Sequence, residues 1–158
     1  MSWIINVIKR LFTHYNVFVD MDGVIADIEA AINFLARYAS EPGFFRSLSP
    51  IKHNLKYVKK LNRRWNVSLY IISAVPNMAA AEDKWYWIQK YLPRIKRKQV
   101  IFCPVGADKS DYVGNLHGIL LDDYRINIQK WVAKKNNYAY QITDDMTVKM
   151  FYDSLKVL

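Results

Sequence analysis

The sequence predicts an α/β fold in which helices flank a parallel sheet. Three observations support this prediction: short apolar runs recur along the chain, segments of helical period separate them, and most runs end in polar residues. Strands that alternate with helices form parallel sheets through right-handed crossovers. The 158 residues are 52% hydrophobic and 15% aromatic, enough to bury one packed core. No repeat, low-complexity segment or linker divides them, so we expect a single domain over residues 1–158.

The expected strands are short and rich in β-branched and aromatic residues. They span residues 15–19, 67–72, 100–103, 118–121 and 138–142. The expected helices place apolar residues at helical spacing, and they lie at 1–13, 27–38, 50–65, 77–92, 126–134 and from about 146 onward. Asn77 can cap the fourth of these helices, and Pro93 ends it.

The first helix, over residues 1–13, is expected to be amphipathic. Packing on the domain is the simpler interpretation, and contact with a membrane surface or a partner is the alternative. Its apolar run is short and no small-residue cleavage site follows, so a signal peptide is not expected. No stretch of the chain approaches the ~20 apolar residues that span a bilayer.

The charge of the chain suits anionic partners such as phosphates, nucleotides or nucleic acid, because it is +9 with a pI near 9.6. Basic residues cluster at 59–64 and at 94–98, where solvated helix faces or loops are the alternative to a binding surface. The single cysteine, Cys103, excludes an intramolecular disulfide. This fits a reducing compartment, and we expect a cytoplasmic location.

The stretch over residues 15–24 organises the chain, because a buried strand ends there in Asp20 and Asp22 and is followed by Gly23. In an open α/β sheet, ligands bind beyond the carboxyl ends of the strands. Two neighbouring acids repel each other unless a cation lies between them, and oxygen ligands suit Mg²⁺. Gly23 permits a tight turn beside a ligand. The alternative is an ordinary polar turn that ends a strand.

Polar residues also follow three later strands: Ser73, Lys109, and Asp122 with Asp123. Each has an ordinary interpretation by itself, such as a hydroxyl bonded to the backbone or a solvated lysine. Together they indicate phosphoryl transfer, which needs a nucleophile, a proton donor and positive charge around the phosphoryl oxygens. An aspartate can attack phosphorus, while Lys109 and Ser73 can stabilise the phosphoryl group.

These residues match the four motifs of the haloacid dehalogenase-like (HAD) phosphohydrolases over about residues 15 to 124. Within that superfamily, the sequence most resembles the 5'(3')-deoxyribonucleotidase family. The stretches that carry this closer resemblance are residues 20–27, 41–45, 84–87, 108–109 and 120–123.

The resemblance implies a Rossmann-like core, bound Mg²⁺ and a phosphoaspartyl intermediate. Asp20 would be the nucleophile and a metal ligand. Asp22 would act as general acid and then base, and would bind the metal through its backbone carbonyl. An acid two residues after the nucleophile is the phosphatase pattern, because it provides a base for water. Asp122 would bind Mg²⁺, and Asp123 would support it.

Ser73 and Lys109 would hold the phosphoryl group. The family usually has two adjacent hydroxyl residues at its second motif, but Ala74 follows Ser73 here. One phosphate contact would therefore be lost or supplied by a backbone N–H.

The resemblance also implies a short helical cap, inserted after the first strand over about residues 27–50. This segment is shorter than the family's cap, where most residues that distinguish bases and sugars would lie. Phe44 and Phe45 follow a Pro-Gly pair and could stack on a base, and core packing of the cap is the alternative.

We therefore expect a Mg²⁺-dependent phosphomonoesterase that hydrolyses nucleoside monophosphates, in particular deoxy forms. One alternative is a HAD phosphatase for another small phosphate or a nucleic-acid end. A second is a basic nucleic-acid-binding protein on a HAD fold, against which the intact acids Asp20 and Asp22 count. The sequence leaves the oligomeric state open, a homo-oligomer included.

Overall fold

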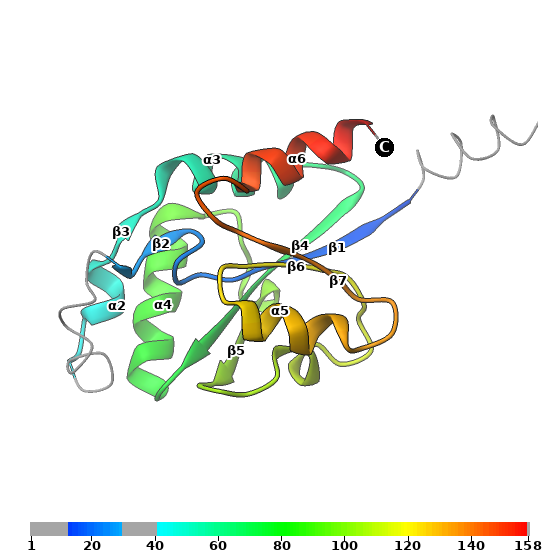
Figure 1. The fold of residues 1–158 in the computed structure, drawn as a ribbon. Helices are drawn as coiled ribbons and strands as arrows, with labels where there is room; N and C mark the ends of the chain where they lie inside the picture. Colours follow the sequence, from blue (N-terminus) through cyan, green and yellow to red (C-terminus); the bar gives the residue numbers. More distant parts are fainter. Residues whose placement is uncertain (1–12, 30–40, 158) are drawn as a thin grey trace, which may run out of the picture.

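A five-stranded parallel sheet forms the centre of the computed structural model, which describes residues 13–29 and 41–157 (Figure 1). The strand order is β5-β4-β1-β6-β7. The strands are β1 (Tyr15–Val19), β4 (Val67–Val75), β5 (Val100–Pro104), β6 (Ile119–Asp122) and β7 (Tyr138–Gln141). Each lies within three residues of its predicted position, and the predicted α/β fold is confirmed.

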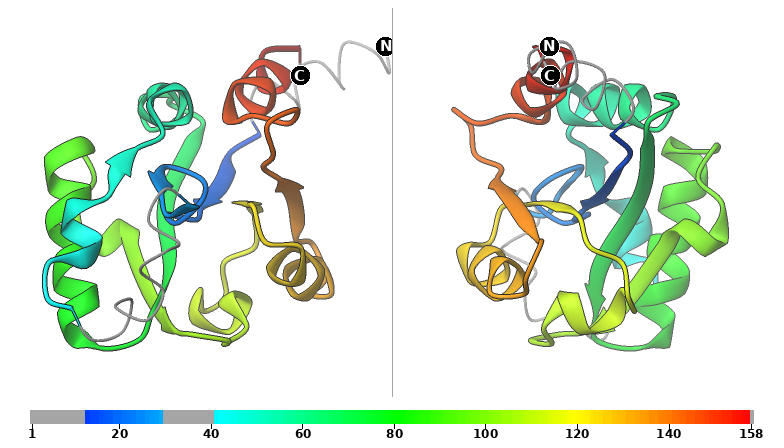
Figure 2. Two further views of the ribbon diagram at one scale, coloured as in Figure 1. Left: turned by 60° about the vertical axis from the view of Figure 1, so that its left-hand side comes forward. Right: turned by 90° about the vertical axis from the view of Figure 1, so that its right-hand side faces the viewer.

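Apolar side chains bury the central strand β1 on both of its faces, which is why its sequence is a continuous apolar run. Val17 and Val19 belong to a cluster that includes side chains of α3 (Lys52–Leu61), α4 (Met78–Tyr91) and α6 (Val148–Val157). Phe18 belongs to a cluster on α5 (Arg125–Val132), where its ring centroid lies 4.9 Å from that of Trp131. Helices therefore cover the sheet on two sides (Figure 2).

The ends of α4 agree with the predicted signals. The side chain of Asn77 caps the helix by accepting a hydrogen bond from the backbone N–H of Ala80 at 2.9 Å. The helix ends at Tyr91, two residues before Pro93. The helix expected at 50–65 is shorter in the structure because Pro50 pairs in a strand and a turn follows Leu61.

The segment inserted after β1 leaves and rejoins the core through a small antiparallel pair, β2 (Ala26–Asp27) and β3 (Ser49–Pro50). Asp27 pairs with Ser49 instead of opening the expected helix. Most of the helices expected at 1–13 and 27–38 lies outside the described residues. The boundaries of the cap and the single-domain organisation stay predictions.

The returning part of the insertion, α2 (Phe44–Ser47), packs on α4. The indole N–H of Trp87 donates to the carbonyl of Leu48 at 2.8 Å, and Arg46 forms an ion pair with Asp83 at 3.3 Å. Within the described residues, no helix has the length and apolar character needed to cross a bilayer.

Candidate active site

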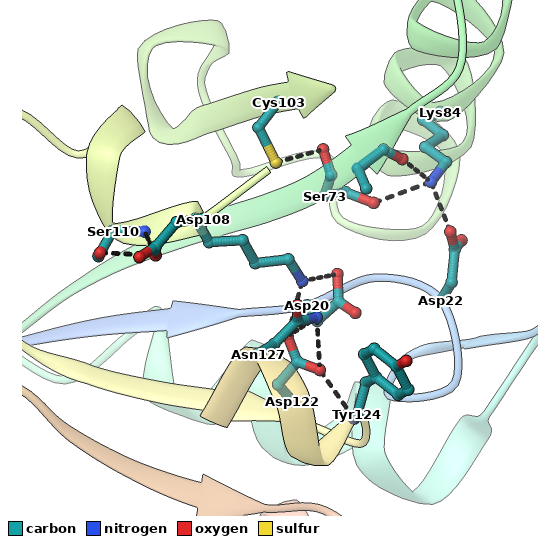
Figure 3. Close-up of polar contacts among 12 residues, drawn as sticks. Asp20, Asp22, Ser73, Lys84, Cys103, Asp108, Ser110, Asp122, Tyr124 and Asn127 are labelled. Atoms are coloured by element: carbon teal, nitrogen blue, oxygen red, sulfur yellow. Dashed lines mark hydrogen bonds and ion pairs between the residues drawn. The ribbon is translucent and has the colours of Figure 1, made fainter. Parts of the chain in front are cut away.

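Four of the predicted site residues, Asp20, Asp22, Ser73 and Asp122, lie near the carboxyl ends of β1, β4 and β6 (Figure 3). Val19 of β1 is level with Ile71 of β4 and Leu121 of β6. Asp20 and Asp122 therefore leave the sheet side by side, and the Asp20 N–H donates to the carbonyl of Leu121 at 2.9 Å. The parallel register places residues that are about 100 positions apart in one site.

The ammonium group of Lys109 lies between two of these carboxylates. Its Nζ is 2.8 Å from Asp20 Oδ1 and 2.6 Å from Asp122 Oδ2, and the side chain is almost fully buried. A short 3-10 helix (Lys109–Tyr112) presents it, capped by Asp108, which accepts from the Ser110 N–H at 2.9 Å. Burial disfavours the charged ammonium, but Asp20 and then Asp122 outweigh it and raise the pKa of Lys109. Lys109 therefore carries its positive charge throughout the neutral range.

Asp122 is fully buried and held by several donors. Its Oδ1 accepts from the Tyr124 N–H at 2.9 Å, and the Asn127 side-chain amide donates to both oxygens at 3.0 and 3.2 Å. Burial and then the charge of Asp20 raise the Asp122 pKa to about 6, although Lys109 opposes this shift. The carboxylate is fixed in place but remains costly to ionise.

A third carboxylate joins this pair. Oxygens of Asp20, Asp122 and Asp123 lie within 4.8 Å of one another. Burial, followed by the charges of Asp20 and Asp122, raises the pKa of Asp123 to about 7. Lys109 supplies one positive charge against these three acids, which leaves an excess of negative charge that a divalent cation with oxygen ligands would balance. The donor set therefore fits Mg²⁺. The carboxylate of Asp22 is not part of this cluster.

Gly23 makes the close approach to this cluster sterically feasible. Its φ is +76°, and a Cβ built there would lie 2.0 Å from Asp123 Oδ2. The turn is fixed by the Gly23 N–H, which donates to the Ala26 carbonyl at 2.8 Å, and by the Asn54 amide, which donates to the Val24 carbonyl at 2.9 Å. Only glycine combines this backbone conformation with the required space.

A second buried lysine, Lys84 of α4, organises the other half of the site (Figure 3). Its ammonium donates to Asp22 Oδ2 at 2.5 Å, to Ser73 Oγ at 2.9 Å and to the Ala74 carbonyl at 2.7 Å. An ammonium has three donors, so these bonds saturate it. Lys84 thereby bridges the carboxylate of Asp22, which follows β1, and the hydroxyl of Ser73, near the carboxyl end of β4.

The two oxygens of Asp22 differ in their environment. Oδ2 is bound by Lys84, whereas Oδ1 is buried and lacks a hydrogen-bond partner among the described residues. Burial raises the Asp22 pKa, Lys84 lowers it, and Asp20 raises it again, with a net upward shift. A carboxyl group with a raised pKa and one free oxygen is suited to carry a proton.

Phe44 and Phe45 lie in α2, and their rings contact each other edge to face with centroids 5.1 Å apart. Both are buried, and the ammonium of Lys84 lies 4.3 Å from the centroid of Phe45. In this structure both rings pack in the interior. Base stacking by either ring stays a prediction.

Comparison with known proteins gives the family. The profile of the family described as 5' nucleotidase, deoxy (pyrimidine), cytosolic type C protein (NT5C) matches residues 30–149, about three quarters of the chain. The chain belongs to this family. The match begins after the first strand and its two acids, so it does not include Asp20 and Asp22, whose roles stay predictions.

Relatives of this family member are named as putative 5'(3')-deoxyribonucleotidases. A putative 5'(3')-deoxyribonucleotidase of Vibrio phage KVP40 is 30% identical over 96 residues, which cover 54% of this chain and 55% of that protein. One from Staphylococcus aureus strain Mu50 is 28% identical over 133 residues, covering 64% and 73% respectively. The chain thus matches little more than half the length of the phage relative.

Two solved structures share the fold at low sequence identity. A chain of the Pnkp1/Rnl/Hen1 complex aligns with a TM-score of 0.59 at 16% identity, covering 82% of this chain and 46% of that one. The HAD domain of the Legionella pneumophila effector Lem4 aligns with a TM-score of 0.52 at 9% identity, covering 92% and 94%. These likenesses show the fold alone, and they confirm the HAD-type core that the resemblance implied.

Two residues of the candidate site were not predicted from the sequence as site residues, Lys84 and Asn127. A signal for Lys84 was present, because it occupies a buried position of α4 together with Ala81, Trp87 and Ile88, at helical spacing. A lysine on the apolar stripe of a helix needs a buried partner. Asn127 carried no comparable signal.

Proposed function

We propose that the chain is a Mg²⁺-dependent phosphomonoesterase that hydrolyses deoxyribonucleoside monophosphates through a phosphoaspartyl intermediate on Asp20. One observation carries this proposal: the two acids after β1 are divided between two buried lysines. Asp20 lies against Lys109 beside further carboxylates, whereas Asp22 is held by Lys84 with one oxygen free. A nucleophile and a proton donor need this difference in environment.

Asp20, Asp122 and Asp123 would hold Mg²⁺ through their carboxylates, which gives Asp123 a direct contact in place of the supporting role that the resemblance implied. Asp22 would add its backbone carbonyl. The ion would neutralise charge on the nucleophile and on the phosphoryl oxygens. Lys109 adds a fixed positive charge at the same place.

The reaction proceeds in two steps on the chain's own residues. A carboxylate oxygen of Asp20 bonds to phosphorus as the bond to the ester oxygen breaks, and Asp22 gives that oxygen its proton. Asp22, now ionised, then takes a proton from water. The water oxygen bonds to phosphorus, and the bond between phosphorus and Asp20 breaks, which releases inorganic phosphate and restores both acids.

Ser73 and Lys84 position the groups that react. Because Lys84 donates to Ser73 Oγ, the hydroxyl keeps its own hydrogen free for a phosphoryl oxygen. The Ala74 carbonyl accepts the third bond of Lys84. Since its donors are saturated, Lys84 acts through Asp22 and Ser73, and we assign it a positioning role.

A turnover screen with Mg²⁺ tests this function. It compares deoxyribonucleoside and ribonucleoside 5'- and 3'-monophosphates with sugar phosphates and p-nitrophenyl phosphate, with Asp20→Asn as the inactive control. We expect the highest kcat/KM on a deoxyribonucleotide and no turnover in EDTA. A sugar phosphate turned over faster than every nucleotide would replace the nucleotidase proposal with a general HAD phosphatase.

A further inference from the structure

The positive charge of the chain is concentrated in one continuous segment. Residues 42–107 contain thirteen Lys and Arg but only two acids, a net charge of +11, whereas the remainder of the chain has a net charge of −2. Of those two acids, Asp83 is buried against Arg46, which leaves Glu82 as the exposed carboxylate of this segment. The surface of these elements therefore carries almost no negative charge.

Two adjoining hollows lie in this basic surface, beside the ends of α3 and α4. One, of about 150 Å³, lies between the ends of the two helices, and the other, of about 450 Å³, follows the start of β4. Arg94 lines both hollows, Lys59 and Arg63 line the first, and Lys98 lines the second. We call these hollows and the four exposed cations the basic groove.

The cations of the basic groove differ from other basic residues nearby. Arg64 donates to the carbonyl of Leu155 at 3.3 Å, and Arg97 donates to the carbonyl of Val100 at 2.8 Å and lies near the ring of Trp85. Among residues 13–29 and 41–157, by contrast, none of the four groove cations forms an ion pair or a hydrogen bond through its side chain. Four uncompensated cations around a hollow favour an anionic ligand.

Side chains that suit bases accompany these cations. Trp65 lines neither hollow, but it is 72% exposed and lies in the turn between α3 and β4, which joins the lining residues Arg63 and Val67. The amides of Asn62 and Gln99 line the hollows as neutral hydrogen-bonding groups. Aromatic rings beside a cationic groove bind single strands by stacking bases while the cations follow the phosphates. We propose that the basic groove binds a single strand of nucleic acid, with a base stacked on Trp65.

The shape of the surface favours a strand over a bilayer. The cations surround hollows, which can hold the narrow phosphate backbone of a single strand. The surface of a bilayer is flat and would not enter them. The groove also lies at the opposite end of β4 from Ser73, about 20 Å away at ~3.3 Å per residue. Binding in the groove therefore leaves the catalytic end of the sheet open, and this inference does not depend on the proposed phosphatase activity.

The test measures the fluorescence anisotropy of a labelled single-stranded oligonucleotide without terminal phosphates, in EDTA, with the 158-residue chain. If four phosphates are neutralised, affinity should fall about fiftyfold between 50 and 200 mM salt, from a slope of about −0.7 per contact. The Arg63→Gln/Arg94→Gln variant should lose two contacts, so the same change in salt should weaken binding only about sevenfold. Trp65→Ala should bind about five- to 150-fold more weakly.

The matched control is Lys134→Gln/Lys135→Gln, which removes the same charge from the turn between α5 and β7. It should keep the fiftyfold salt dependence, and both double variants should keep phosphatase activity if that activity is present. Equal losses in the two variants would overturn the proposal, because net charge alone would then explain binding. Absence of oligonucleotide binding at 50 mM salt, or tighter binding to anionic vesicles that depends on Arg63 and Arg94, would also overturn it.

Discussion

Lys109 and Lys84 are both buried ammonium groups in one site, but their surroundings differ in charge. Lys109 contacts the carboxylates of Asp20 and Asp122. Lys84 contacts the carboxylate of Asp22 together with two neutral oxygens. The first centre keeps an excess of negative charge, whereas the second is balanced. The Lys109 centre can therefore accept another cation, and the Lys84 centre is complete without one.

This difference separates the two tasks of the proposed reaction. The positive charge of Lys109 lies where the proposed nucleophile would attack phosphorus. Lys84 fixes Asp22 where an acid would donate and accept a proton. Variants that disrupt either the Lys109 centre or the Lys84 centre alone test whether the two tasks are separate.

The largest effect is expected from Asp20→Asn, which removes the nucleophile from the Lys109 centre. Turnover should be abolished, while the melting temperature without metal should hold or rise because repulsion among carboxylates is relieved. Steady-state kinetics and thermal unfolding measure the two quantities. Substantial turnover in protein free of deamidation would rule out Asp20 as the nucleophile.

Lys84→Met should be the next most damaging change, because it leaves Asp22 and Ser73 without their shared donor. We expect kcat to fall ~10²–10⁴-fold, as for loss of a positioned acid in Asp22→Asn, with little change in KM. The two changes should be far from additive in the double variant, because the residues act as one unit. Lys84→Arg, which keeps the charge, should recover part of the activity.

The opposite pattern would contradict the positioning role. A raised KM with unchanged kcat in Lys84→Met would mean that Lys84 binds the phosphate directly, as Lys109 is proposed to do. Lys109→Met provides that comparison in the same assay.

Gly23→Ala tests the geometry of the metal-binding half. The new Cβ would meet Asp123 at 2.0 Å in a backbone conformation with φ of +76°, so we expect a loss of ~1–3 kcal/mol in the free energy of unfolding and a higher Mg²⁺ requirement. Gly43→Ala is the matched control: its φ is +86°, but its Cβ would have open space. Both variants should lose stability, and only Gly23→Ala should change the Mg²⁺ requirement. An unchanged Mg²⁺ requirement in Gly23→Ala would show that Asp123 does not contribute to metal binding.

A smaller effect is expected from pH in the absence of metal. The pKa values of Asp122 and Asp123 are raised to about 6 and about 7, so the folded state binds these protons more tightly than the unfolded state. Their contribution should therefore destabilise the protein as pH rises from about 4 to about 7. Melting temperatures in EDTA should decline less across this range in Asp123→Asn than in the unmodified chain. Identical declines would show that Asp123 does not titrate there.

The sheet and the strand-end residues could be predicted because local pattern determines them. The apolar run at 15–19 requires burial on both faces, and parallel strands bring Asp20 and Asp122 to one edge. The start of the cap could not be predicted in the same way. Residues after Asp27 have helical composition, but pairing with Ser49 determines the conformation of Asp27 itself.

Lys84 escaped prediction for a related reason. Its partner Asp22 lies 62 positions earlier, and no local pattern states which buried acid a buried lysine will meet. Asn127 bonds to Asp122 only because α5 begins beside the end of β6. Contacts of this kind depend on how the elements pack and not on the sequence within any one of them.

The packing of α2 on α4 has a consequence for how substrate choice and rate are linked. Trp87, Asp83 and Lys84 lie within a little more than one turn of α4, and each contacts the segment at 45–48. Under the proposal that the rings of α2 contact the nucleoside, a substitution that moves this segment would also move the turn of α4 that holds Asp22 through Lys84. Broader specificity should therefore be accompanied by slower proton transfer. Mutations that weaken the packing of α2 on α4 would be needed first, because they would let α2 change without moving Lys84.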